Sequence, residues 1–271
     1  MATREATADL WQGLRATSVL IELTRRSIRS SFRRTVLGPL WYSAEQLLFT
    51  SGFALLSAGL FDRSFSEAVV HVGSGMMIFT LVADVSLGMT GVVRNLQVMK
   101  SSPLPFSSAF LITLFEKFQL TAFRFLGLSV LFVWNLRFSS RTIEKLGPQA
   151  VALLALLVFA FGCAFFVGGL SVRYRDLEPI FGVVSRLAFF VTPVFWSFDD
   201  ISLGASAAES GLLSVQRFNV FAWFVVGIRD GVVASYFPFG SVFGLLFLGL
   251  VVAAVGIVTY LMSFDNIRRW A

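Results

Sequence analysis

Residues 150–179 read AVALLALLVFAFGCAFFVGGLSVRYRDLEP, and this stretch decides the class of fold. Its first part, 150–172, carries no charged side chain and is long enough for one helix across a bilayer, which needs about 20 apolar residues. Its second part, 173–179, is polar and ends in a proline, and apolar residues resume directly after it. The stretch therefore predicts a membrane-spanning helix, a tight polar break and the start of a further helix.

The rest of the chain repeats this alternation of apolar runs and polar breaks. The 271 residues are 56% hydrophobic and only 14% charged, with a mean hydropathy of +0.78. Soluble domains are about 45–50% apolar and about 25% charged, so this composition excludes a soluble enzyme. We expect an all-α integral membrane protein in which 38–271 form a transmembrane domain. Its six spanning helices should cover about 38–60, 70–93, 108–135, 150–172, 180–196 and 241–262.

One apolar stretch, Phe218–Val233, does not fit this scheme. It is short for a span and contains Asn219, Arg229 and Asp230. Non-helical or short helical backbone is tolerated at membrane depth where it is packed in protein. We therefore expect a re-entrant or interfacial segment before the last span, with a seventh span as the alternative.

Residues 1–37 form a polar, amphipathic segment ahead of the first span. Aliphatic residues recur in it at roughly helical spacing, and arginines fall between and after them. This pattern predicts a helix on the membrane surface whose arginines reach lipid headgroups, with a disordered basic tail as the alternative. The aliphatic residues are Leu10, Leu14, Val19, Leu20, Leu23 and Ile28, and the arginines are Arg15, Arg25, Arg26, Arg29, Arg33 and Arg34.

The distribution of basic residues predicts the orientation in the membrane. With both termini in the cytoplasm, the cytoplasmic segments 1–37, 94–107, 173–179 and 263–271 hold 13 lysines and arginines. The external segments 61–69, 136–149 and 197–240 hold six. Because cytoplasmic loops are enriched in basic residues, we expect both ends inside. The net charge of +6 then reflects topology and anionic headgroups rather than a nucleic-acid partner.

The sequence offers little material for covalent chemistry. It lacks the phosphate-binding motif G-x-x-x-x-G-K-[ST], and its one histidine, His71, and one cysteine, Cys163, make neither a metal site nor a disulfide. We expect no catalytic residue, metal or cofactor in this chain. Ionisable residues inside spans are costly, and interhelical ion pairs explain them better than the proton relay of a carrier. These residues are Glu45, Asp84, Glu116, Lys117, Arg124 and Arg186.

Aromatic residues make up 15% of the chain and cluster at two places. Ordinary helix packing and interfacial belts explain most of them. Aromatic faces can also line a path for sugar rings or lipid tails, so both clusters are candidates for a translocation path. One consists of Trp41, Tyr42, Phe49 and Phe53, and the other of Phe189, Phe190, Phe195 and Trp196.

Two motifs carry a resemblance to a known family. The first, RRTVLGPLWY at 33–42, joins a basic end to the first span, and the second, FFVTPVFW at 189–196, follows RYRDL at 173–177. With six expected spans, the chain resembles the membrane subunit of a type-2 ABC exporter. It is most similar to the branch that exports O-antigen, capsule or teichoic-acid chains on lipid carriers. The chain has Glu45-Gln46 and Asn219-Val220 where that family often has Asn-Pro.

The resemblance implies a bacterial plasma-membrane transporter built from two copies of this chain and two copies of a separate subunit that binds ATP and magnesium. It implies that 1–37 contain the family's gate helix at the cytoplasmic surface, where arginines would capture the phosphates of a lipid-linked polysaccharide. It also implies that two cytoplasmic segments dock on the ATPase. The gate-helix residues would be Arg25, Arg26, Arg29, Arg33 and Arg34. The ATPase contacts would be Arg94, Gln97, Lys100, Arg173, Tyr174, Arg175 and Asp176.

Two other functions remain open from the sequence. An ABC exporter of a small molecule or lipid would share the same architecture. An integral membrane transferase would need an acid–base pair near the interface, for which Asp199 and Asp200 are the best external candidates, although such a pair is more often a turn or a helix cap.

Overall fold

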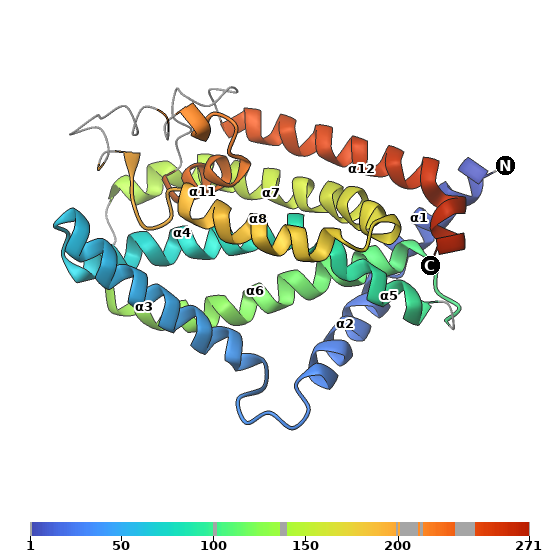
Figure 1. Ribbon diagram of the computed structural model, residues 1–271, viewed down its shortest axis with the longest axis horizontal. Coiled ribbons are helices and arrows are strands. Elements are labelled where there is room, and N and C mark those ends of the chain that lie inside the picture. Colours follow the sequence, from blue (N-terminus) through green and yellow to red (C-terminus); the bar gives the residue numbers. More distant parts are fainter. Residues whose placement is uncertain are drawn as a thin grey trace.

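The computed structural model describes residues 2–99, 102–135, 140–198, 200, 211, 214–230 and 242–270, and its regular elements there are all helical. The long helices run side by side, and both termini lie at the same end of the bundle (Figure 1). The helices are α1 (Ala2–Arg15), α2 (Thr17–Ser31), α3 (Trp41–Phe61), α4 (Phe65–Ser86), α5 (Val92–Met99), α6 (Ser107–Asn135), α7 (Ser140–Arg173), α8 (Leu177–Val191), α11 (Val220–Asp230) and α12 (Val242–Trp270). The 3-10 turns are η1 (Gly38–Leu40) and η2 (Leu87–Gly91).

Four helical stretches of the described part of the chain are long and apolar enough to cross a membrane: Gly38–Phe61, Phe65–Gln97, Pro148–Arg173 and Phe243–Arg269. The expected class of all-α membrane protein is therefore confirmed, and the chain is multi-pass. The other two expected spans correspond to α6, which carries three charged residues, Glu116, Lys117 and Arg124, and to α8, which has 15 residues. A helix of that length extends about 22 Å, less than the hydrocarbon core of about 30 Å.

Two of the expected spans leave α-helical geometry before their expected ends, whereas α7 begins at Ser140, ahead of the expected 150, and α12 continues to Trp270, past the expected 262. The helix expected over 70–93 leaves regular α-helical geometry at Ser86, and η2 separates it from α5. The helix expected over 180–196 ends at Val191, because Thr192 is extended, with ψ of 141°. The residue before a proline avoids helical geometry, and Pro193 follows Thr192. Side chains hold the bends that follow: Gln216 donates to the Val191 carbonyl at 2.7 Å and Ser57 to that of Phe195 at 2.8 Å.

Residues 1–37 contain two helices that break at Ala16 rather than one continuous surface helix. Their apolar faces pack on protein: Leu20 and Ile28 are buried, and Leu10, Leu14 and Leu23 pack on the core, whereas Val19 is exposed. α1 contacts α12 and α6, and α2 contacts α6.

A carboxylate fixes α1 to the start of α6. Asp9 accepts hydrogen bonds from the backbone N–H groups of Phe106 and Ser107, both at 2.9 Å, and from the Tyr260 hydroxyl at 2.6 Å. An acidic side chain at a helix N-terminus satisfies unpaired N–H groups and opposes the helix dipole. Asp9 therefore supplies from another helix the cap that α6 needs, and it also contacts α12.

The tightest helix pair is α7 with α12. Gly162, Gly249 and Gly256 lie where the two backbones meet, and a Cβ atom added at Gly249 would fall 2.7 Å from the Ala155 carbonyl oxygen. Small residues let membrane helices approach closely and gain dispersion contacts. The main hydrophobic core adjoins this pair and includes Phe110, Phe165 and Tyr260, whose rings lie 5.2–5.3 Å apart.

Candidate functional site

A basic cavity of about 390 Å³ lies between α2, α5 and α6. We call it the arginine cavity because Arg26, Arg29 and Arg33 line it and its lining includes no acidic residue. Arg26 and Arg29 lie about one helical turn apart on α2, and Arg33 lies in the turn that follows this helix. The remaining lining residues are Leu23, Ser27, Ser30, Asn95, Met99 and Ile112.

The five predicted gate-helix arginines do not share one environment. Arg25 and Arg26 both lie near Glu22, at 3.9 and 3.0 Å, whereas Arg29 and Arg33 form no ion pair among the described residues. Arg25 and Arg34 are exposed and lie outside the lining. Guanidinium groups bind phosphate through paired hydrogen bonds. The uncompensated charge of Arg29 and Arg33 therefore makes this cavity suited to an anionic headgroup.

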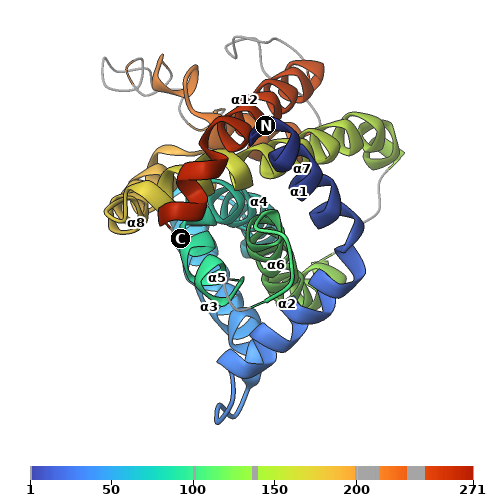
Figure 2. The same ribbon diagram turned by 90° about the vertical axis from the view of Figure 1, so that its right-hand side faces the viewer.

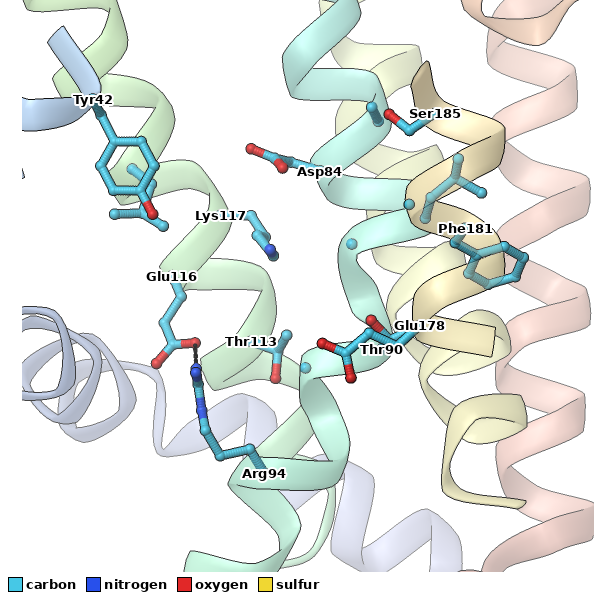
Figure 3. Close-up of a pocket in the computed structure, with 16 residues that line it drawn as sticks. Tyr42, Asp84, Thr90, Arg94, Thr113, Glu116, Lys117, Glu178, Phe181 and Ser185 are labelled. Carbon is cyan, nitrogen blue, oxygen red and sulfur yellow. Dashed lines mark hydrogen bonds and ion pairs between the residues drawn. The ribbon is translucent and has the colours of Figure 1, made fainter. Parts of the chain in front are cut away.

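A second cavity, of about 410 Å³, lies on the other side of α6, between α3, α4, η2 and α8. We call it the polar cavity, and Figure 3 shows the side chains that point into it. Asp84 pairs with Arg124, and Arg124 also stacks on the Tyr42 ring at 4.9 Å. Lys117 lies between Asp84 and Thr113 (Figure 3), with no carboxylate of the described residues within 4 Å of its Nζ.

One carboxylate, Glu116, separates the two cavities. It is 6% exposed, and its Oε1 accepts a hydrogen bond from the Ser27 hydroxyl of α2 at 2.8 Å. Its Oε2 accepts from Arg94 of α5 at 3.0 Å and, at a long 3.5 Å, from Asn95. Asn95 also donates to the Thr113 hydroxyl at 2.8 Å. Residues of three helices therefore meet at a single buried charge.

A third cavity, of about 500 Å³, continues from the polar cavity, with which it shares Ala83, Asp84 and Ser185. We call it the aromatic cavity because phenylalanines of α3, α4 and α8 line it. Phe53 and Phe189 meet edge to face at 4.9 Å, and Phe79 and Phe189 at 5.4 Å. Its other aromatic lining residues, Phe49 and Phe190, are 50% and 58% exposed, so the cavity opens at the molecular surface.

The aromatic residues predicted to line a translocation path lie in different surroundings. Four of them, Phe49, Phe53, Phe189 and Phe190, line the aromatic cavity, and Tyr42 lines the polar cavity. Phe195 packs behind Phe53 at 5.8 Å. The two tryptophans line none of the three cavities: Trp41 is exposed, whereas Trp196 is buried and lies 5.6 Å from Phe198.

The predicted ATPase contacts lie at the end of the bundle that carries both termini (Figure 1). On α5, Gln97 is exposed, and Arg94 is exposed along its length although its guanidinium binds Glu116. Lys100 lies outside the described residues. At the turn between α7 and α8, Arg173 stacks on Tyr174 at 5.1 Å. All four predicted residues of that turn, Arg173, Tyr174, Arg175 and Asp176, are exposed and therefore accessible to a partner.

The residues considered for other functions have structural partners where the structure describes them. Asp200 binds Arg63 at 2.6 Å and accepts a hydrogen bond from the Ser197 backbone N–H at 2.6 Å, as expected of a turn residue. Asp199 lies outside the described residues, and so do residues 231–233 of the stretch expected to be re-entrant, of which Val220–Asp230 is helical. Within the described part of the chain, no three His, Cys, Asp or Glu residues gather as a metal site would require.

Sequence reasoning missed two features of this region. Phe79 and Met76 line the aromatic cavity from α4, but isolated apolar residues within a span give no sign of facing a cavity. The role of Glu116 as a junction was also missed. The signal for it was present, since a carboxylate within a span needs partners, but the partners come from helices distant in the sequence.

Two of these cavities are continuous within a helical, multi-pass membrane chain, an arrangement that is typical of membrane transport proteins. Comparison with known proteins shows which transporters the chain is similar to. The chain is 20% identical, over 242 residues, to an O-antigen export system permease protein RfbA of Klebsiella pneumoniae, covering 88% of this chain and 89% of the relative. A second RfbA permease of Klebsiella pneumoniae is 21% identical over 189 residues, covering 68% and 70%. No family model matches the chain. These relatives confirm the resemblance to the permease subunits of type-2 ABC exporters.

Proposed function

We propose that this chain is the transmembrane subunit of an ATP-driven exporter that moves a lipid-linked, O-antigen-like polysaccharide across the bacterial plasma membrane. The observation that carries the proposal is the order of the three cavities. An arginine cavity without acidic lining residues adjoins a polar cavity, which continues into an aromatic one. That order suits a substrate with a pyrophosphate, hydroxyl-rich sugars and ring faces that stack on aromatic side chains.

In this proposal the chain crosses the membrane six times, with both termini in the cytoplasm. α6 and α8 supply the two spans beyond the four long apolar helices, and the Phe218–Val233 segment is re-entrant on the external side. The excess of basic residues in the segments assigned to the cytoplasm supports this orientation. The arginine cavity then lies toward the cytoplasmic end, where a lipid-linked substrate is first met.

Two copies of the chain enclose the path, and two ATP-binding subunits drive it. The aromatic cavity opens at a surface formed by α3 and α8, so a second copy facing it would close the path against lipid. ATP and magnesium belong to the partner subunit, which docks on α5 and on the turn between α7 and α8. Export is driven if ATP binds the two conformations of the complex with different affinity.

The proposal is tested by purification from native membranes in mild detergent, followed by reconstitution. An ATP-binding subunit should copurify in equal amount, and vesicles holding the complex should move a lipid-linked polysaccharide only when ATP is supplied. A chain that purifies without an ATPase, or that moves the polysaccharide without ATP, would contradict the proposal.

A lipid exporter of the same architecture is the second candidate. The phenylalanines of the aromatic cavity and its opening beside exposed α3 and α8 side chains favour it, because such a surface also suits an acyl chain. The two candidates separate in the same vesicles: a lipid exporter would move a phospholipid with ATP and leave the polysaccharide where it is.

A further inference from the structure

Glu116 joins two helices for which separate functions are proposed. α2 carries Arg26 and Arg29 of the arginine cavity, and α5 carries two predicted ATPase contacts, Arg94 and Gln97. Both helices pack against α6, on different sides of it (Figure 2). Glu116 lies on α6 and binds α2 through one carboxylate oxygen and α5 through the other.

We propose that Glu116 is a positioning residue that fixes α2 relative to α5, so that a ligand in the arginine cavity and a partner bound to α5 act on each other. The coupling half of this inference rests on the proposed function. The positioning half concerns this chain alone and rests on the contacts of a single buried side chain.

Burial makes the junction restrictive. A carboxylate that is 6% exposed cannot exchange its protein donors for water at low cost, because an unpaired buried charge is strongly destabilising. The Ser27 hydroxyl and the Arg94 guanidinium therefore stay together at the Glu116 carboxylate, at 2.8 and 3.0 Å from its two oxygens. A shift of α5 that carries Arg94 away leaves the charge short of a donor, and so does a shift of α2 that carries Ser27 away.

The junction also touches both cavities. Ser27 and Asn95 line the arginine cavity, while Glu116, Arg94 and Thr113 line the polar cavity. A ligand that draws α2 inward through Arg29 thus acts on the same carboxylate that holds Arg94. By linkage, whatever such a ligand does to the binding of a partner at α5, the partner does equally to the binding of the ligand.

The remaining polar contacts of α2 do not provide a second link to α5. Arg26 pairs with Glu22 of its own helix, and the Ser30 and Ser31 hydroxyls donate to the Ser27 carbonyl. Among the described residues, Glu116 is the group to which α2 and α5 both donate a side-chain hydrogen bond. Ser27→Ala removes the α2 arm while Glu116 keeps its donors from α5.

The positioning half is tested on the chain alone by electron–electron distance measurement. Spin labels would be placed at Ile21 of α2 and Gln97 of α5, which are both exposed, in a Cys163→Ala background. Ser27→Ala and Glu116→Gln should broaden the distance distribution, and Ser27→Thr, which keeps a hydroxyl, should restore it. Ser31→Ala is the matched control, since its hydroxyl bonds only within α2 and lies outside the arginine cavity, and it should change nothing. Unchanged distributions in both Ser27→Ala and Glu116→Gln would overturn the inference.

The coupling half is tested in the unlabelled complex with its ATPase, in phosphatidylcholine vesicles with and without a polyprenyl pyrophosphate. Ser27→Ala should reduce the stimulation by the polyprenyl pyrophosphate, measured against the unstimulated rate of the same variant, at least threefold, with Ser27→Thr and Ser31→Ala like the wild type. Unchanged stimulation beside a broadened distance distribution would overturn the coupling role. A wild-type complex that is not stimulated at all would instead contradict the proposed function, and the distance measurement would still decide whether the junction exists.

Discussion

Individual charges inside the bundle are held by partners on other helices. Asp84 of α4 meets Arg124 of α6, and Glu116 of α6 meets Arg94 of α5. The sequence suggested interhelical pairs for its intramembrane charges but could not assign partners, because each pair joins residues 22 or more positions apart. Glu45, Lys117 and Arg186 depart from that expectation, since none of them lies within 4 Å of an oppositely charged side chain among the described residues. Lys117 faces the polar cavity.

Asp84→Asn should destabilise the folded chain by about 2 kcal/mol, because it leaves the Arg124 guanidinium without its anion. The side chains of Arg124 and Asp84 are 13% and 22% exposed, so water in the cavity offsets part of the larger loss expected of a fully buried pair. Thermal unfolding in detergent would measure the difference. Glu22→Gln breaks an ion pair that is exposed on both sides and should cost less than about 0.5 kcal/mol. Equal losses in the two variants would contradict this assignment.

Arg29→Gln should weaken the binding of a polyprenyl pyrophosphate about fivefold, corresponding to ~1 kcal/mol for one exposed charge-assisted contact. The matched control is Arg25→Gln, which removes the same charge from the same helix but lies outside the arginine cavity. Binding would be measured by titrating a fluorescent analogue into the purified chain. If the two variants lose affinity equally, the arginines attract the ligand through general charge and not through this cavity.

The positions of the spanning helices could be predicted from the sequence where the bilayer requires a long apolar helix. The spans expected over 108–135 and 150–172 lie within α6 and α7, because a bilayer demands long helices with satisfied backbone groups. The end of α8 and the break between α1 and α2 were not placed. Pro193 accounts for the extended Thr192, but the bend is held by Gln216, which donates to the Val191 carbonyl, and by Asn219, which donates to the Thr192 hydroxyl. α1 is positioned through Asp9 on α6, so both boundaries also depend on tertiary partners.

Gly162→Val should destabilise the pair of α7 and α12 by roughly 2 kcal/mol or more, since side-chain atoms at Gly162 would collide with the backbone around Ala253. A Cβ atom at Gly169, on the same helix, meets no atom within 4 Å, so Gly169→Val should be tolerated. Unfolding midpoints and the share of monodisperse protein after size-exclusion chromatography would compare the two. Comparable losses would show that β-branched residues in α7, and not the close approach, cause the effect.

The molecule as a whole is packed unevenly. α7 and α12 meet through glycine and alanine, although α12 also leaves apolar side chains outside, such as Phe243 at 69% exposure. α3 and α8 expose Leu48 at 72% and Leu187 at 63%, and the aromatic cavity opens between these two helices. We therefore expect the second copy of the proposed dimer on the face that carries this opening.

Cysteine placed at Leu187 should form cross-links between two copies of the chain in native membranes, in a Cys163→Ala background. Met262 of α12 is 79% exposed but lies on the helix bound to α7, so Met262→Cys should remain uncross-linked. Covalent dimers on denaturing gels would report the result. Dimers formed from Met262→Cys and not from Leu187→Cys would place the interface on the opposite helices.

The glycine contacts between α7 and α12 also have a mechanical consequence. Where two backbones touch, neither helix can slide or tilt without collision, so we expect α7 and α12 to move as one rigid unit. α3 is held to α6 in the same way, because a Cβ atom at Gly127 would fall 2.6 Å from the Ser43 carbonyl oxygen, whereas Gly182 of α8 has no close backbone approach. We therefore expect a movement at the end that carries α5 to displace α8 more than the other three helices.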